Sequence, residues 1–248
     1  MPLDIVLKIR RRKSPGEPAY DETFTVPYKP GMNVISALLE IQRRPVNAKG
    51  EGTSPVVWDS NCLEEVCGAC TMVINGRVRQ ACSTLIDQLE QPIVLEPMTK
   101  FPVVRDLVVD RSRMFESLKK ARAWISIDGS WDQGPGPRQA PAAQETAYKL
   151  SECMTCGCCL EACPNVNGRN PFMGPAAISQ VRLFNLHPTG RFEAPERLEA
   201  MMGEGGIHEC GNAQNCAAVC PKEIPLTTSI AAVNRDVAIH AIRTRLGF

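Results

Sequence analysis

The chain has 248 residues, 44% of them hydrophobic, which is enough for two modest domains with apolar cores. Its 28 basic and 27 acidic residues give a formal net charge of +1, so no overall field attracts nucleic acid, and we expect no nucleic-acid partner. No apolar run reaches the roughly 20 residues that span a bilayer, and the N-terminus lacks the apolar stretch of a secretory signal. We therefore expect a cytosolic chain without a transmembrane segment of its own.

The first hundred or so residues predict short strands around one helix. The segments with strand-like alternation or flanking turn signals are residues 4–10, 22–28, 71–74, 78–82 and 93–95. Asn33 is a typical N-cap and predicts a helix over residues 34–43 with apolar residues along one side. The pair Asn75-Gly76 predicts a tight hairpin turn. This order of elements indicates a small α+β domain.

The second half of the chain predicts helices that alternate with cysteine groups. The helical segments are residues 109–122, 144–152, 175–184, 195–202 and 227–242. Residues 129–143 read GSWDQGPGPRQAPAA, and this density of Gly and Pro predicts neither helix nor strand. The change of character predicts two domains, residues 1–110 and residues 111–248.

Twelve cysteines in a cytosolic chain indicate metal ligation, because that compartment keeps thiols reduced. Cys62, Cys67 and Cys70 have the C-x4-C-x2-C spacing, and Cys82 lies beyond the predicted hairpin. This spacing is typical of a plant-type [2Fe–2S] ferredoxin site. Gly68 has no side chain, so backbone N–H groups there can approach the cluster sulfurs and raise the reduction potential. A structural zinc site is the alternative, but it prefers two C-x2-C pairs and this group has one.

The two later cysteine groups share one register. The first reads C-x2-C-x2-C-x3-C-P, the bacterial ferredoxin run, whose fourth cysteine ligates the other cluster in two-cluster ferredoxins. The second has the same spacing, with Ala213 at its second ligand position. Counting ligands predicts a [4Fe–4S] cluster on four cysteines, namely Cys153, Cys156, Cys159 and Cys220. The remaining three predict a [3Fe–4S] cluster, namely Cys163, Cys210 and Cys216. Paired zinc sites are again the alternative.

Cys158 has no place in this count, and we interpret it as a non-ligand that packs near a cluster. The alternative is an exchange ligand under oxidative damage. His187, His208 and His240 lack ligand spacing. No Ser–His–Asp arrangement, phosphate-binding loop or dinucleotide fingerprint is present in the sequence, so we predict no catalytic residues. Three clusters without a catalytic constellation indicate an electron relay between partners.

This order of motifs resembles the iron–sulfur subunit of succinate dehydrogenase and fumarate reductase. The resemblance covers nearly the whole chain and includes NVISALLEI, CGACTMVINGR, FPVVRDLVVDRS, CMTCGCCLEACP and CPKEIPLTTSI. The segments CLEEVCGAC and CPNVN are similar to the menaquinone-linked variety that is anchored by a cytochrome b.

The resemblance implies an α+β chain, in which a β-grasp [2Fe–2S] ferredoxin domain precedes an α-helical ferredoxin domain. It implies a flavoprotein partner with covalently bound FAD, where succinate is oxidised to fumarate, and a membrane cytochrome b partner that carries haem b. The chain would lie peripherally on the cytoplasmic side of the cell membrane. Electrons would run from FAD through the three clusters to haem or menaquinone. The chain would be the electron-transfer subunit of complex II and hold no substrate site of its own.

Two positions depart from the ubiquinone-linked members. Those members place tryptophans shortly after the first Cys-Pro pair, where this chain has Asn165 to Arg169. They also place a histidine directly after the first cysteine of the second run, where this chain has Gly211. This chain therefore lacks the side chains that form the ubiquinone site in those members. Their absence favours menaquinone as the quinone, and no residue of this chain is assigned as a quinone ligand.

Three alternatives stay open beside the succinate dehydrogenase interpretation. The same subunit type serves quinol:fumarate reductases, and this sequence leaves the direction of electron flow undetermined. A stand-alone carrier usually holds two four-iron clusters, which Ala213 and the N-terminal domain argue against. The third alternative is a zinc-stabilised interaction module without redox function.

Overall fold

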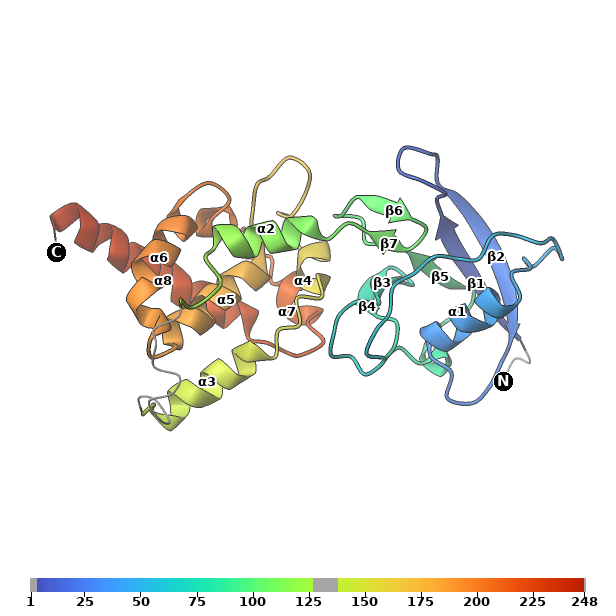
Figure 1. Ribbon diagram of the computed structural model, residues 1–248, viewed down its shortest axis with the longest axis horizontal. Helices are drawn as coiled ribbons and strands as arrows, with labels where there is room; N and C mark the ends of the chain where they lie inside the picture. The colour runs from blue at the N-terminus through green and yellow to red at the C-terminus, as the bar shows by residue number, and fades with distance from the viewer. Residues whose placement is uncertain (1–3, 127–137, 248) are drawn as a thin grey trace. The chain divides into compact units, whose positions relative to one another are not determined.

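The computed structural model describes residues 4–126 and 138–247. Residues 129–137 of the Gly- and Pro-rich stretch, and the N-terminal residues 1–3, lie outside the described part. The chain forms two compact units: Met1–Arg111 with Met154–Glu161, and Ser112–Cys153 with Ala162–Phe248. Figure 1 labels the strands and helix α1 in the first unit and mainly helices in the second.

The first unit contains a five-stranded mixed sheet in the order β2-β1-β5-β3-β4. The strands are β1 (Asp4–Arg11), β2 (Tyr20–Pro27), β3 (Thr71–Ile74), β4 (Arg77–Gln80) and β5 (Ile93–Glu96). Strands β1 and β5 run parallel, and the other neighbours are antiparallel. The predicted hairpin is confirmed: Asn75 and Gly76 have φ values of 48° and 74°, as a type I′ turn requires. Strand β4 ends earlier than predicted, at Gln80.

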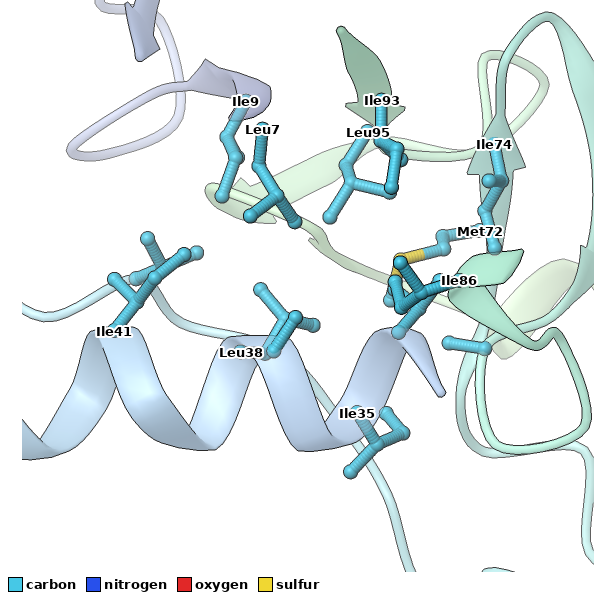
Figure 2. Close-up of a cluster of buried hydrophobic side chains, with 14 of the residues drawn as sticks. Leu7, Ile9, Ile35, Leu38, Ile41, Met72, Ile74, Ile86, Ile93 and Leu95 are labelled. Atoms are coloured by element: carbon cyan, nitrogen blue, oxygen red, sulfur yellow. The ribbon is translucent and has the colours of Figure 1, made fainter. Parts of the chain in front are cut away.

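Helix α1 (Val34–Arg43) begins and ends where the sequence predicts. The side chain of Asn33 caps it by accepting the N–H of Ser36 at 2.8 Å. Figure 2 shows Leu38 and Ile41 directed at the sheet, opposite Leu7 and Ile9, in the core of the first unit. Each such buried Leu or Ile side chain contributes roughly 1.5–3 kcal/mol. A mixed sheet crossed by one helix is the β-grasp arrangement, and it confirms the predicted fold class of this half.

The helix predicted over residues 109–122 begins later than expected. Residues 103–109 form a small hairpin of β6 (Val103–Arg105) and β7 (Val108–Val109), and helix α2 spans Ser112–Lys120. Asp106, with φ 45°, makes the turn, and its carboxylate accepts the backbone N–H groups of Arg12 and Val57 at 3.1 and 2.9 Å. These bonds from distant strands and loops hold Val109 in pairing with Val103, which the local helical pattern did not reveal.

The second unit is helical, as predicted. Its helices are α2, α3 (Pro141–Ser151), α5 (Pro175–Leu186), α6 (Ala194–Met202), α7 (Asn215–Ala218) and α8 (Leu226–Leu246), whereas α4 (Cys158–Glu161) belongs to the first unit. The described residues also form three 3-10 turns: η1 (Ile86–Gln88), η2 (Gly190–Glu193) and η3 (Ile207–Glu209). Helix α5 contacts α3, α6 and α8, and its Ile178 and Val181 are fully buried.

The prediction that residues 129–143 are irregular was wrong for residues 141–143. They form the first turn of α3, because Pro141 occupies the first helical position, where its fixed φ favours a helix start and its missing N–H costs nothing. Helix α8 also extends four residues beyond its predicted end, to Leu246. In the part of the chain that the structure describes, no helix has the length and apolar character to cross a membrane.

Candidate iron–sulfur sites

In the loop that carries the first cysteine group, backbone N–H groups surround the sulfur of Cys62. The backbone N–H groups of Glu64, Val66 and Cys67 all point at Cys62 Sγ, at 3.4, 3.3 and 3.3 Å. Leu63 and Glu65 adopt the left-handed region, which lets successive N–H groups converge. These donors, above all Glu64 and Val66, lower the pKa of the Cys62 thiol to about 7. The thiolate, which is the form that binds iron, is therefore favoured.

The β3–β4 hairpin brings the remaining two cysteines of this group together. Cys70 precedes β3 and Cys82 follows β4, and the backbone N–H of Cys82 lies 3.5 Å from Cys70 Sγ. Burial, together with the neighbouring Cys82, raises the pKa of the Cys70 thiol to about 12. A buried pair of this kind ionises only when a cation compensates the charge. Asn33 also fixes this end of the loop, because its Nδ2 donates to Cys82 O at 2.8 Å.

The side chain of Arg111 forms hydrogen bonds with the backbone of the same loop. Its guanidinium donates to the carbonyl oxygens of Gly68 and Ala69 at 2.7 and 2.6 Å. The hydroxyl of Thr71 also donates to Gly68 O, at 2.7 Å. Two carbonyl groups that would otherwise need water are thus satisfied, and the loop between Cys67 and Cys70 is held in one conformation.

A segment of the second cysteine group, Met154–Glu161, packs within the first unit. It carries Cys156 and Cys159, and also Cys158, which is fully buried. Glu161 holds the C-terminal end of this segment in place, because its carboxylate accepts the backbone N–H groups of Thr99 and Lys100 at 2.9 and 3.0 Å. A hydrogen bond from Cys158 is the main cause that lowers the pKa of the Cys156 thiol to about 7.

The other two cysteines predicted for the four-iron cluster belong to the second unit. Cys153 follows helix α3, and Cys220 follows helix α7 and accepts the N–H of Ile224 at 3.5 Å. The ligand set of this cluster therefore stays a prediction from the motif.

The three cysteines predicted for the three-iron cluster line one cavity within the second unit. Cys163, Cys210 and Cys216 share this cavity with Ala213, the position where a fourth ligand is missing. Burial first, and then the neighbouring thiols of Cys163 and Cys210, raise the pKa of the Cys216 thiol. The ligand count predicts these three cysteines beside Ala213, and they line one cavity with it, although no three such side chains of the described residues lie close enough together to hold a metal ion.

The histidines make ordinary structural contacts. Nδ1 of His187 accepts the backbone N–H groups of Thr189 and Gly190, both at 3.3 Å, in the turn after α5. His208 and His240 lie 3.4 and 3.9 Å from the carboxylates of Glu209 and Glu199.

Known proteins match the chain over both units. Residues 6–116 match the family described as 2Fe-2S iron-sulfur cluster binding domain, and residues 149–224 match the family described as 4Fe-4S dicluster domain. The chain is 65% identical over 239 residues to the succinate dehydrogenase iron–sulfur subunit of Bacillus subtilis (strain 168), covering 96% of this chain and 94% of that one. The chain belongs to the succinate dehydrogenase and fumarate reductase iron–sulfur subunits.

Two further similarities agree with membership of this family. A fumarate reductase iron–sulfur subunit of Haemophilus influenzae is 32% identical over 224 residues, covering 84% of this chain and 82% of that one. A chain of the solved Mycobacterium smegmatis Sdh1 complex in the apo form superposes with a TM-score of 0.81 at 25% identity, covering 96% of this chain and 97% of that one.

In this iron–sulfur subunit, the cysteine ligands stay a prediction from the motifs, and the motifs did not reveal the side chains that form hydrogen bonds around them. Gln80, Arg111 and Glu161 have polar contacts around the cysteine loops, yet none belongs to a ligand motif. Their sequence signals are indirect: Gln80 lies near Cys82, Arg111 lies in the segment FPVVRDLVVDRS, and Glu161 lies within the second cysteine run.

Proposed function

We propose that this subunit passes electrons, in a succinate:quinone oxidoreductase, between a flavoprotein that oxidises succinate to fumarate and a membrane quinone. The observation that carries the proposal is the 65% identity, over nearly the whole chain, to a succinate dehydrogenase iron–sulfur subunit. When bound, iron–sulfur clusters supply one-electron redox chemistry, whereas the protein supplies ligands, orientation and electrostatics. The residues of this chain hold the clusters and tune them.

The proposed ligand sets follow the cysteine register. They are Cys62, Cys67, Cys70 and Cys82 for [2Fe–2S]; Cys153, Cys156, Cys159 and Cys220 for [4Fe–4S]; and Cys163, Cys210 and Cys216 for [3Fe–4S]. The N–H donors around Cys62 support the first set, and the cavity shared by the last three cysteines supports the third. The match to a 4Fe-4S dicluster domain supports two clusters in the later groups.

The proposed partners are a flavoprotein that carries FAD and a membrane cytochrome b subunit that carries haem b, with this chain bound peripherally on the cytoplasmic side. Menaquinone is the proposed acceptor. Gly211 lies against Asn165, the first residue of the stretch Asn165 to Arg169 that differs from ubiquinone-linked members: a β-carbon at Gly211 would lie 2.8 Å from Oδ1 of Asn165. A histidine at position 211 would need Asn165 to move, which supports a quinone site built from other side chains.

Low-temperature EPR of the complex, isolated with its natural partners, tests this function. We expect a three-iron signal in the oxidised protein and a two-iron signal after addition of succinate. Dithionite is the control reductant, since it reduces the clusters whether or not the complex acts on succinate. A complex whose clusters respond to dithionite and never to succinate or fumarate contradicts the proposal.

The second candidate is fumarate reduction, which uses the same subunit in the opposite direction. It is favoured by the similarity to fumarate reductase subunits at about one-third identity, but the nearer similarity to a succinate dehydrogenase outweighs it. Rates of succinate oxidation by a menaquinone analogue and of fumarate reduction by the corresponding quinol, measured on one preparation, decide between them.

A further inference from the structure

The last two turns of helix α8, residues 239–246, extend away from the packed part of the second unit. Earlier in this helix, Val233 and Val237 are 0% and 9% exposed, and the helix contacts α5 and α6. Residues 242–247, in contrast, are all exposed, and Figure 1 shows this end of α8 reaching beyond α6. The helix therefore begins as a packed element and ends with most of its surface accessible to solvent.

The outward face of these two turns is apolar. Ile239, Ile242 and Leu246 are 41%, 60% and 66% exposed. Their spacing of three and then four residues places them on one face of the helix. With about 100° between successive residues, that face lies opposite Val237, which packs into the unit. Single exposed apolar residues are common on protein surfaces, but an aligned apolar stripe indicates an interaction surface.

Two arginines flank this apolar stripe. Arg243 follows Ile242 and Arg245 precedes Leu246, so their side chains leave the helix on opposite sides of the stripe. Both are exposed, and within the part of the chain that the structure describes neither forms an ion pair with a carboxylate. Basic residues in a last turn complement the helix dipole, but the dipole gives no reason for the exposed apolar stripe between them.

The other charges near this end of α8 leave it positive. Arg235, one turn before Ile239, has a 72% exposed side chain and pairs with Asp236 at 3.2 Å. Asp236 is the one acidic residue of α8, which contains three arginines. The carboxylate of Glu199 lies 3.9 Å from His240, on the side of α8 that contacts α6. The outward face thus combines apolar side chains with an excess of positive charge, which complements an anionic surface.

We propose that this end of α8 binds an anionic membrane surface directly. Ile239, Ile242 and Leu246 would enter the headgroup region, while Arg243 and Arg245 would contact lipid phosphates. An exposed apolar stripe flanked by basic residues is the pattern of a helix that lies in the membrane interface. The inference rests on the proposed function, because that function places the subunit at a membrane, and it adds a contact with lipid to the contact with a membrane subunit.

The chemistry of the face favours lipid over a protein as its occupant. Arginine can lay its apolar stem along the stripe and still place its guanidinium at a phosphate, which it binds through two N–H groups. The stripe is one residue wide on the convex end of a helix. A protein interface has an apolar core in which charged residues are scarce, whereas here the two cations lie directly beside the apolar side chains.

The test is co-sedimentation of the cluster-loaded full chain with vesicles that contain no other protein. Vesicles of equal parts phosphatidylglycerol and phosphatidylcholine should bind the chain, and vesicles of phosphatidylcholine alone should bind it far more weakly. Arg243→Gln/Arg245→Gln should weaken binding to the anionic vesicles by about 25-fold, about fivefold for each arginine. The matched control is Arg43→Gln/Lys119→Gln, which removes two exposed positive charges from other helices and should bind as the wild type does.

A second pair of variants tests the apolar stripe. Ile242→Gln should weaken binding to the anionic vesicles roughly tenfold, because less apolar surface enters the interface. Phe115→Gln is the matched control, since Phe115 of α2 is 55% exposed, close to the 60% of Ile242, and lies outside α8. All four side chains changed on α8 and α2 are exposed, so visible absorption of the clusters should be unchanged in every variant.

Three outcomes overturn the proposal. The full chain does not bind the anionic vesicles; the control variants weaken binding as much as the α8 variants do; or binding requires a membrane protein in the vesicles, which would make this face a protein interface. None of these results affects the reduction of the clusters by succinate. Failure of that reduction instead overturns the proposed function, whatever the vesicles bind.

Discussion

A β-carbon placed on Gly68 would lie 2.6 Å from the β-carbon of Cys156 and 2.7 Å from its α-carbon. Both residues belong to the first unit. The loop between Cys67 and Cys70 therefore meets the loop of Cys156 at a distance that excludes any side chain. Gly68 also has φ +71°, which side chains disfavour. One residue thus meets two separate requirements for glycine.

We predict that Gly68→Ala destabilises the first unit by about 2–5 kcal/mol, combining left-handed strain with overpacking against Cys156. The matched control is Gly31→Ala. Gly31 has nearly the same φ, +76°, but a β-carbon added there would have no atom beyond its chain neighbours within 4 Å. Gly31→Ala should lower the free energy of unfolding only by the left-handed backbone strain, about 1–2 kcal/mol. Urea unfolding of the loaded protein, followed by the visible absorption of its clusters, measures both. Equal losses in the two variants would contradict the contact.

Arg111→Lys should loosen the loop between Cys67 and Cys70. An ammonium group cannot span two carbonyl oxygens as the planar guanidinium does, so one bond is lost, at about 1–2 kcal/mol. We expect a broadened [2Fe–2S] EPR spectrum. Arg113→Lys is the matched control, because Arg113 bridges the carbonyl oxygens of Asn167 and Asn170 at 3.0 and 3.1 Å within the second unit. A spectrum that broadens equally in the control would show that Arg111 has no specific effect.

Asp106→Asn should destabilise the first unit by about 3–5 kcal/mol, because it removes the more deeply buried of the two carboxylates that pair with the guanidinium of Arg11, the other being Glu22. Arg11 Nε lies 3.0 Å from Asp106 Oδ1, and both side chains are 1% exposed. Burial is the largest single influence and lowers the pKa of Arg11, but the bond and charge of Asp106, with smaller contributions from Tyr20 and Glu22, together outweigh it and raise that pKa. Asparagine tolerates the positive φ at this turn, so the variant adds no backbone strain; it removes the charge and one of the two oxygens that accept N–H bonds from Arg12 and Val57.

Asp21→Asn is the control for the Arg11–Asp106 pair. Asp21 pairs with Arg10 at 3.0 Å on the surface, where such pairs contribute less than about 1 kcal/mol. Urea unfolding monitored through the [2Fe–2S] absorption reports on the unit that contains both pairs. Similar losses for the buried and the exposed pair would refute the electrostatic argument.

Ala213→Cys should convert the three-iron cluster to a four-iron cluster, because position 213 lines the cavity that Cys163, Cys210 and Cys216 share. The oxidised EPR signal should fall and a new signal should appear on reduction. Ala217→Cys is the control, since Ala217 lies in the same run outside the residues that line this cavity. A full three-iron signal in a completely loaded Ala213→Cys protein would contradict the ligand assignment.

Elements with a local cause were predictable from the sequence. Helix α1 begins at Val34 as expected, because the Asn33 side chain bonds an N–H three residues away. The hairpin at Asn75-Gly76 forms for a similar reason, since two residues with positive φ suffice for the turn. The expected helix start at Val109 was wrong, because the turn at Asp106 depends on Arg12 and Val57, which lie far away in the chain.

The sequence by itself determined that the chain carries [2Fe–2S]- and [4Fe–4S]-type domains, as the family matches confirm, since ligand spacing in each cysteine run is local and the two later runs share one register. Tertiary structure alone decided that Met154–Glu161 packs in the first unit, and that Gln80 reaches Cys158 across 78 positions and Arg111 reaches Gly68 across 43. Such contacts have no motif, because one amide or guanidinium serves wherever folding brings it within hydrogen-bonding distance. Spacing therefore predicts the cysteine ligands, and the fold supplies the side chains that form hydrogen bonds around them.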